Sequence, residues 1–250
     1  MLWRGLVCRT PSLLSRLMAH SYYLDVHAHI VHEQFEGEEA AIAEKCLAQG
    51  VRQIVVNGLN PDSNRKILQL CKAFPRLYRP AIGIYPLDAA CNVIDESTWK
   101  HPFPPPERFD VDLEMDFIEE MAMAKQVVAI GECGLDKYYL TDDVSMAEQE
   151  RVLRRLMRIA KAADLPIILH TRKAEERVFQ MLQEEGVVKA DFHCFGGKVR
   201  NLPSITFEVI TRGVDETGGE DRRGGVLPVH SLWRRADGLV SGLGSGPPSG

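Results

Sequence analysis

Three polar side chains occupy alternate positions in a short stretch that otherwise has the composition of a buried strand. The stretch is YYLDVHAHI, residues 22–30, and its polar residues are Asp25, His27 and His29. Side chains two residues apart on a strand point to the same side. A charged or imidazole face in a protein core is costly unless partners satisfy it. These residues therefore either hydrogen-bond to one another and to the backbone, or they bind a metal ion.

Glu132, His170 and His193 each stand at the carboxyl end of a further predicted strand. Imidazoles and a carboxylate that converge from separate strands are the ligands preferred by a divalent transition metal. A single histidine of this kind is more often a hydrogen-bonded core residue. The complete set nevertheless favours a metal site, in which the two oxygens of Glu132 could bridge two ions.

The elements that must position these residues alternate along the chain between apolar, β-rich segments and amphipathic helical ones. The predicted strands are 22–29, 51–58, 78–86, 126–134, 165–171 and 189–195. Helices are predicted at 38–49, at 111–124, at 174–185, along a stripe of Ile67, Leu70, Cys71 and Phe74, and after a capping box of Ser145 and Glu148. This alternation indicates a parallel sheet, which is either a barrel or an open doubly wound sheet. Candidate ligands at the ends of many strands are typical of a barrel.

Residues next to the candidate ligands have their own expected roles. Asp25 is predicted to lie one layer deeper and to accept a ring N–H, which would fix an imidazole tautomer. The alternative is that its carboxylate caps a neighbouring backbone group. Cys133 and Cys194 directly follow Glu132 and His193, so strand alternation turns them to the opposite side, where we expect small buried hydrophobic residues rather than ligands.

The composition of the 250 residues is that of a soluble globular protein, with 45% hydrophobic and 26% charged residues and a net charge of -5. The acidic balance argues against a broad electrostatic grip on nucleic acid, although it allows a phosphate ester held through metal ions. Six cysteines without a C-x-x-C pair indicate reduced thiols inside the cell. We predict no membrane span and no stable protein partner.

The two ends of the chain differ in composition from the middle. Residues 1–21 contain Arg4, Arg9 and Arg16 but no acidic residue, which is typical of a mitochondrial or plastid transit peptide. The alternative is an untargeted extension on a cytoplasmic protein. Residues 211–250 are rich in glycine and predicted to be disordered. The expected organisation is thus an extension, a barrel domain over 22–210, and a tail.

Five motifs in order along residues 22–200 carry a resemblance to a known family: DVHAH, AIGIYP, AIGECGLD, PIILHTR and FHCFGG. They resemble the TatD family of metal-dependent deoxyribonucleases, which are amidohydrolase-like barrel hydrolases. The resemblance implies a (β/α)8 TIM-barrel-like fold with one or two divalent ions, Mg, Mn or Zn, at its top. By position, His27 and His29 match the first ligand pair, Glu132 the bridging carboxylate, and His170 and His193 the ligands of the second ion.

The resemblance also implies hydrolysis of DNA phosphodiesters, often from a 3′ end, with ends or single strands as the substrate and Glu132 as a catalytic residue. Arg172 lies on the same side as His170 and could bind a phosphate, although a salt bridge at the rim is the alternative. Asp136 is expected near the mouth, in contact with substrate. Tyr138 and Tyr139 either stack a base or pack.

The chain departs from the family pattern at two places. The family usually has histidine where this chain has Tyr85, for which we expect a substrate-side role. A final carboxylate, in a Glu-Thr-Asp motif, has no match, and Asp215 is the nearest candidate. The last one or two β/α units are therefore predicted to be missing or aberrant, with exposed strand edges and low stability. Alternatives to a nuclease are an inactive truncated form, or a related barrel hydrolase of a small ester or phosphoester.

Overall fold

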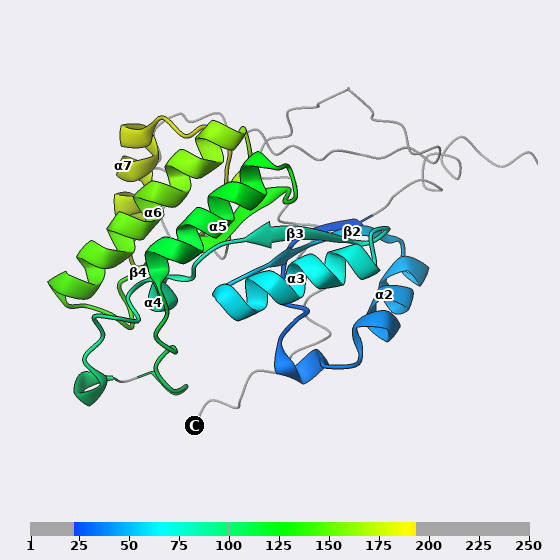
Figure 1. The fold of residues 1–250 in the computed structure, drawn as a ribbon, viewed down its shortest axis with the longest axis horizontal. Helices are drawn as coiled ribbons and strands as arrows, with labels where there is room; N and C mark the ends of the chain where they lie inside the picture. The colour runs from blue at the N-terminus through cyan, green and yellow to red at the C-terminus, as the bar shows by residue number, and fades with distance from the viewer. Residues whose placement is uncertain (1–22, 100, 194–250) are drawn as a thin grey trace, which may run out of the picture.

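The computed structural model describes residues 23–99 and 101–193 (Figure 1). Four predictions lie outside these residues: the extension 1–21, the burial of Cys194, the candidate carboxylate Asp215, and the glycine-rich segment 211–250. The fold and the site below are built from the described residues.

Six parallel strands form a single sheet whose spatial order, β1 to β6, follows the chain. An open doubly wound sheet reverses its strand order at a switch point, whereas this sheet advances in one direction, as a barrel wall does. The strands are β1 (Tyr23–Ala28), β2 (Val51–Asn57), β3 (Tyr78–Ile82), β4 (Ala129–Asp136), β5 (Ile167–Arg172) and β6 (Ala190–His193). The predicted α/β near-barrel architecture is confirmed.

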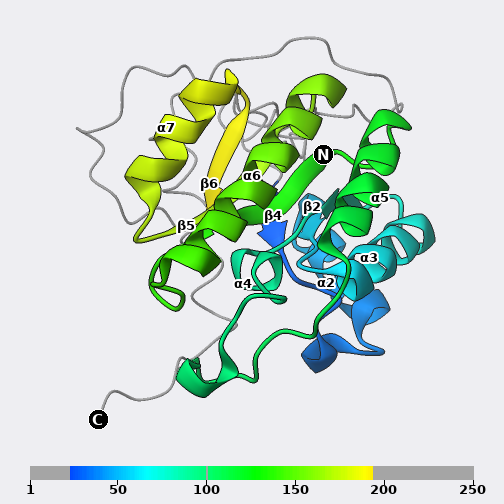
Figure 2. The same cartoon turned by 60° about the vertical axis from the view of Figure 1, so that its left-hand side comes forward.

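Helices cross between the strands and cover the outer face of the sheet, and α5, α6 and α7 lie side by side (Figure 2). The α-helices are α2 (Glu39–Ala48), α3 (Pro61–Ala73), α4 (Pro86–Ala89), α5 (Val111–Met123), α6 (Asp143–Ala163) and α7 (Glu175–Glu185), and the 3-10 helices are η1 (Glu33–Phe35) and η2 (Glu96–Thr98). The predicted apolar stripe is confirmed in α3, where Ile67, Leu70 and Cys71 are buried. Phe74 follows that helix as its carboxyl-terminal cap.

Helix α6 begins earlier than predicted. Its amino-terminal cap is Asp142, whose carboxylate accepts a hydrogen bond from the backbone N–H of Ser145 at 2.8 Å. The predicted capping box of Ser145 and Glu148 is therefore wrong, because a carboxylate three residues before Ser145 takes the cap and also complements the helix dipole. None of the helices in the described part of the chain, including the 21-residue α6, is long and apolar enough to cross a bilayer.

Strand β4 is the most deeply enclosed element near the candidate ligands, since all eight of its residues are buried. Its outward side chains Ile130, Cys133 and Leu135 pack in the main core with Leu156 and Met157 of α6. The predicted burial of Cys133 is thus confirmed. This packing gives Glu132, on the same strand, a rigid support.

Candidate metal centre

The carboxylate of Glu132 lies at the centre of the predicted ligands. His27 lies in β1 and His29 directly follows that strand, while His170 and His193 lie in β5 and β6. Parallel strands end at the same edge of a sheet, so residues far apart in sequence meet there. The structure brings all five predicted ligands to this edge.

The two oxygens of Glu132 face different histidines. Oε2 lies 3.4 Å from Nε2 of His27 and 3.2 Å from Nε2 of His29, whereas Oε1 lies 3.1 Å from Nδ1 of His170. Burial of this side chain raises its pKa, but hydrogen bonds from the three imidazoles outweigh burial and hold the pKa well below the usual range of a glutamate. The carboxylate is therefore ionised, with one oxygen on each side of the cluster.

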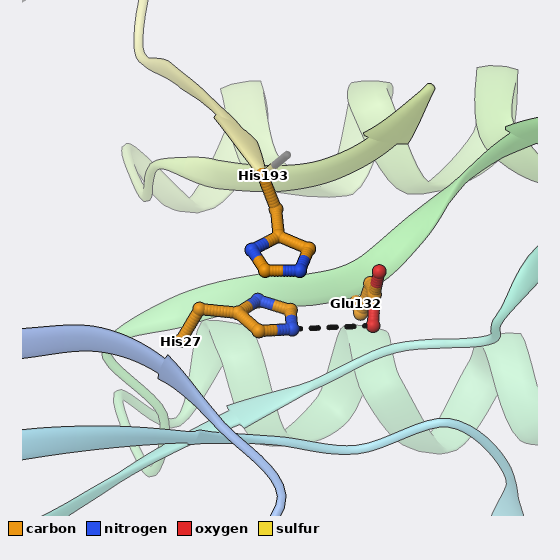
Figure 3. A group of neighbouring side chains, drawn as sticks. All are labelled: His27, Glu132 and His193. Carbon is orange, nitrogen blue, oxygen red and sulfur yellow. Dashed lines mark ion pairs between the residues drawn. The ribbon is translucent and has the colours of Figure 1, made fainter. Parts of the chain in front are cut away.

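His27 and His193 are in contact across the sheet, one from the first described strand and one from the last. Their rings stack with centroids 3.6 Å apart, and one ligand atom from each, together with one from Glu132, lies within 4.8 Å of the others (Figure 3). Burial, followed by repulsion from His27, lowers the pKa of His193 to about 4. At neutral pH His193 is thus a neutral imidazole, the form that binds metals.

These residues fit a divalent metal ion. Neutral imidazole and ionised carboxylate are the donors that such ions take. In addition, Nδ1 of His27 is buried and finds no hydrogen-bond partner among the described residues. A buried polar atom without a partner is costly, and a bound ion with its water is one way to satisfy it.

Asn57, at the end of β2, supports the first two histidines and was not predicted. Its side-chain Nδ2 donates to the backbone oxygen of Val26 at 3.4 Å, next to His27, in the part of β1 where the pairing with β2 shifts register. Its own backbone oxygen lies 3.0 Å from Nδ1 of His29. Because a carbonyl can only accept, Nδ1 of His29 donates this hydrogen bond. Its Nε2 faces Glu132 and lies 3.0 Å from Nε2 of His27. A polar residue closing a buried strand was the available sequence signal.

The structure corrects the prediction for Asp25. This residue is exposed, and its Oδ1 accepts a hydrogen bond from the backbone N–H of His27 at 3.0 Å. The contact observed is therefore the backbone cap, which was the alternative, and not acceptance of a ring N–H. Asp25 acts on the local conformation of β1 and not on an imidazole tautomer.

Asp136 also takes a different position from the predicted one. It is fully buried; its Oδ2 lies 3.1 Å from Nε2 of His170, and its Oδ1 accepts from the backbone N–H groups of Tyr138 and Tyr139. With both oxygens occupied, it orients His170 instead of facing substrate. Burial lowers the pKa of His170, but hydrogen bonds to Asp136 and Glu132 outweigh it and raise that pKa to about 9. A metal ion bound by His170 at neutral pH would therefore have to displace a proton from its ring.

Tyr85 and Arg172 lie on the His170 side of the cluster. The Tyr85 hydroxyl is 3.5 Å from Nε2 of His170. Arg172 is exposed, and its guanidinium carbon lies 4.0 Å from the ring centroid of Tyr138. Within the described part of the chain Arg172 forms no ion pair, so the alternative of a rim salt bridge has no partner there.

Two glycines allow the strands beside the cluster to approach closely. Gly134 has a φ of +148°, and a Cβ at this position would lie 1.9 Å from the backbone oxygen of His170. At Gly83, in the AIGIYP motif, a Cβ would lie 2.8 Å from the backbone oxygen of Glu132. Larger residues would displace the backbone that carries both ligands.

Comparison with known proteins places this geometry in a family. The family model described as TatD related DNase matches residues 24–215. The chain is 32% identical over 175 residues to the "Uncharacterized metal-dependent hydrolase YabD" of Bacillus subtilis, covering 69% of this chain and 60% of that protein. It is 28% identical over 202 residues to the "3'-5' ssDNA/RNA exonuclease TatD" of Musicola paradisiaca, covering 80% and 69%.

Solved structures agree with this assignment. The crystal structure of YJJV, a TatD homolog from Escherichia coli K12, matches with a TM-score of 0.57 at 25% identity, over 72% of this chain and 62% of that one. A TatD family hydrolase from Entamoeba histolytica matches in fold with a TM-score of 0.56 at 20% identity, over 72% and 60%. The chain thus spans about 60% of the length of the Bacillus protein and of both structures. Together these likenesses confirm the TIM-barrel-like fold, and the chain belongs to the TatD family of metal-dependent hydrolases.

Proposed function

We propose that this protein hydrolyses phosphodiester bonds of DNA with the help of one or two divalent ions, acting on ends or single strands. The observation that supports the proposal most is the division of the Glu132 oxygens between the His27 and His29 side and the His170 side. A carboxylate shared in this way suits a pair of cations. The Musicola relative, which is named as an exonuclease of single-stranded DNA and RNA, supports the choice of substrate.

The ligands proposed for the ions are His27, His29, Glu132, His170 and His193. Mg, Mn and Zn are all compatible with this mixture of nitrogen and oxygen donors. A divalent ion held there supplies Lewis acidity, which polarises a phosphoryl oxygen and makes water a stronger acid. Glu132 is the proposed catalytic residue, because its negative charge and its two oxygens serve both sides of the cluster.

The remaining residues of the site are proposed to orient a ligand or to bind the phosphate of the substrate. Asp136 fixes the ring of His170 through Nε2, which leaves Nδ1 directed at the Glu132 side. Burial, reinforced by the negative charges of Glu132 and Asp136, raises the pKa of Tyr85 above its usual range, so its hydroxyl keeps its proton and can donate to a phosphate oxygen. Arg172 can bind a phosphate through its planar guanidinium.

A hydrolase of a small phosphoester is the second candidate. The net charge of -5 favours it, because an acidic protein repels the long anionic backbone of DNA more strongly than it repels a single phosphate. The proposed ligands serve either substrate, since a fold and its metal do not select the ester.

The test is chelator-sensitive hydrolysis by the purified 250-residue chain. We expect nucleotides to be released from a single-stranded oligonucleotide labelled at its 5′ end, in the presence of Mn²⁺ or Mg²⁺, and release to stop with EDTA and with Glu132→Gln. Glu114→Gln is the matched control, because Glu114 is equally buried at 3% exposure but bonds to Asn64 and Arg65 instead of histidines.

The other outcomes separate the candidates. Turnover of bis(4-nitrophenyl) phosphate with the oligonucleotide left intact would favour the small-phosphoester hydrolase. Stoichiometric metal without hydrolysis of either compound would identify an inactive form. Wild-type protein that binds no divalent ion would overturn the proposal.

A further inference from the structure

A set of aromatic rings in mutual contact lies beside the metal centre, and we term it the aromatic ledge. Ring centroids are 4.0 Å apart for His101 and Tyr139, 4.7 Å for Tyr138 and Tyr139, and 5.3 Å for His101 and Phe103. Trp99 extends the set at 5.6 Å from His101. The ledge therefore joins the loop before α5 to the residues that follow β4.

The ledge is fixed to the same groups that hold His170. The backbone N–H groups of Tyr138 and Tyr139 donate to Asp136, the carboxylate bonded to His170. Tyr139 and Trp99 also pack against a small core cluster that Tyr85 contacts. The aromatic faces are thus held next to the candidate catalytic groups by packing and hydrogen bonds and not by a free loop.

Parts of the ledge are open to solvent. Phe103 is 69% exposed and Tyr138 is 45% exposed. Single exposed hydrophobic residues are common, but two exposed aromatic rings that belong to one connected set beside a candidate site are a feature of ligand-binding surfaces. Packing against the core accounts for the inner rings Tyr139 and Trp99. It does not account for the exposed faces of Phe103 and Tyr138.

Two cations accompany the outer ring. The guanidinium carbon of Arg172 lies 4.0 Å from the centroid of Tyr138, and Nζ of Lys173 lies 4.7 Å from it. Neither cation forms an ion pair with another described residue. On a chain with a net charge of -5, two adjacent exposed cations that form no ion pair among the described residues provide a local site for an anion.

We propose that the aromatic ledge, with Arg172 and Lys173, is a subsite that stacks an unpaired nucleobase and binds its phosphate beside the bond to be hydrolysed. Base faces stack on aromatic rings and on guanidinium planes, and cations bind the backbone. Bases within a duplex are already stacked on their neighbours, so the subsite selects single strands and frayed ends. The inference deepens the proposed function and rests on it for the identity of the ligand.

The test compares Tyr138→Ala, Tyr138→Phe and Tyr23→Ala in the full chain. Tyr23 is a matched control because it is 40% exposed and begins β1, at the opposite end of the strand from the ligands. For a single-stranded oligonucleotide we expect Tyr138→Ala to raise KM about tenfold with little change in kcat, as for the loss of one stacked base. Tyr138→Phe keeps the ring and is expected to behave as wild type, as is Tyr23→Ala.

A second substrate isolates the base from the backbone. An oligonucleotide of the same length whose residues all lack bases retains every phosphate, so its KM should be equal for wild type and Tyr138→Ala. If Tyr138→Ala leaves KM for the base-containing oligonucleotide unchanged, or raises KM equally for both, the subsite is overturned.

Binding provides a measurement that does not depend on hydrolysis. An oligonucleotide with 2-aminopurine at its 3′ end should lose fluorescence on binding wild-type protein, since stacking quenches this base, and should retain it with Tyr138→Ala. Quenching without any cleavage would refute the proposed function while supporting the subsite. Cleavage with equal fluorescence for both proteins would support the function and refute the subsite.

Discussion

Two clusters of charged side chains, one inside the sheet and one on the outer helices, differ in what surrounds them. In the inner cluster the side chain of Glu132 is only 4% exposed and its partners are histidines. In the outer cluster arginines of α6 and α7 pair with glutamates, and the side chain of Arg158, which pairs with Glu185 at 2.8 Å, is 64% exposed. Similar distances therefore occur in very different dielectric surroundings.

The difference separates stability from function. Exposed ion pairs contribute about 0–1 kcal/mol each and are screened by salt. A buried charge costs several kcal/mol to desolvate, and only good partners offset that cost. The outer network can therefore be altered with little effect, whereas stability alone does not account for the inner cluster, because burying the charge of Glu132 is costly.

The largest expected effect follows from removing the central charge. Divalent metal at about 1,000 times its Kd should stabilise the wild-type protein by about 4 kcal/mol, measured as a rise in the midpoint of thermal unfolding with added Mn²⁺. Glu132→Gln removes the charged donor and should abolish most of this rise. An equal rise in the variant would mean that the ion binds elsewhere.

Removal of the carboxylate behind His170 should have the next largest effect. Asp136→Asn is expected to weaken metal affinity about 10- to 100-fold, as is usual for residues that orient a histidine ligand. Asp110→Asn is the control, because Asp110 also accepts a backbone N–H, from Leu113, but is exposed and touches no histidine. Competition with a chromophoric chelator measures the metal affinity of both variants. If Asp136→Asn bound metal as tightly as wild type, Asp136 would have no part in supporting the site.

A smaller effect is expected at Asn57. Asn57→Asp replaces the amide donor to Val26 with an acceptor, and should weaken metal affinity about fivefold through the shifted geometry of His27, with a stability loss of about 1–3 kcal/mol. Asn92→Asp is the matched control, since Asn92 donates to the backbone oxygen of Phe109 from an exposed position. Calorimetric titration with Mn²⁺ and urea unfolding give the two quantities, and an unchanged affinity would contradict the supporting role.

The smallest effect is expected in the outer network. Hydrogen bonds from Arg158 and Arg154 lower the pKa of Glu185 from 4.5 to about 2. Because the folded-state pKa is lowered, the stabilisation is present above pH 4.5 and disappears as the pH falls through 2. Glu185→Gln should therefore cost less than about 1 kcal/mol at pH 7 and nothing near pH 2. Urea unfolding at both pH values checks this, and a cost that persists at the lower pH would exclude a charge effect.

The inner cluster was largely predictable because its position depends on the alternation of strand and helix patterns along the sequence. Alternation of strand and helix patterns located the six strands, and parallel strands necessarily end at one edge. Glu132 and His170 therefore came together as expected from their positions alone. Their separation in sequence made no difference to that argument.

The details that were missed depend on contacts that periodicity does not encode. Asn57 acts through an irregular pairing of β1 with β2, and Asp136 is buried because the chain turns back over it at Tyr138 and Tyr139. The cap of α6 was misplaced because Asp142 and Ser145 are both good caps, and only the structure distinguishes the residue that accepts from the residue that donates.

The sequential order of the strands in the sheet has a consequence for the order in which the proposed ligands are synthesised. Each strand pairs with the one synthesised just before it, so a growing chain can lengthen the sheet unit by unit while it leaves the ribosome. His27 lies in the first of these strands and His193 lies in the sixth. Of the proposed ligands, His193 is therefore the last to be synthesised, after the segments that carry the other four.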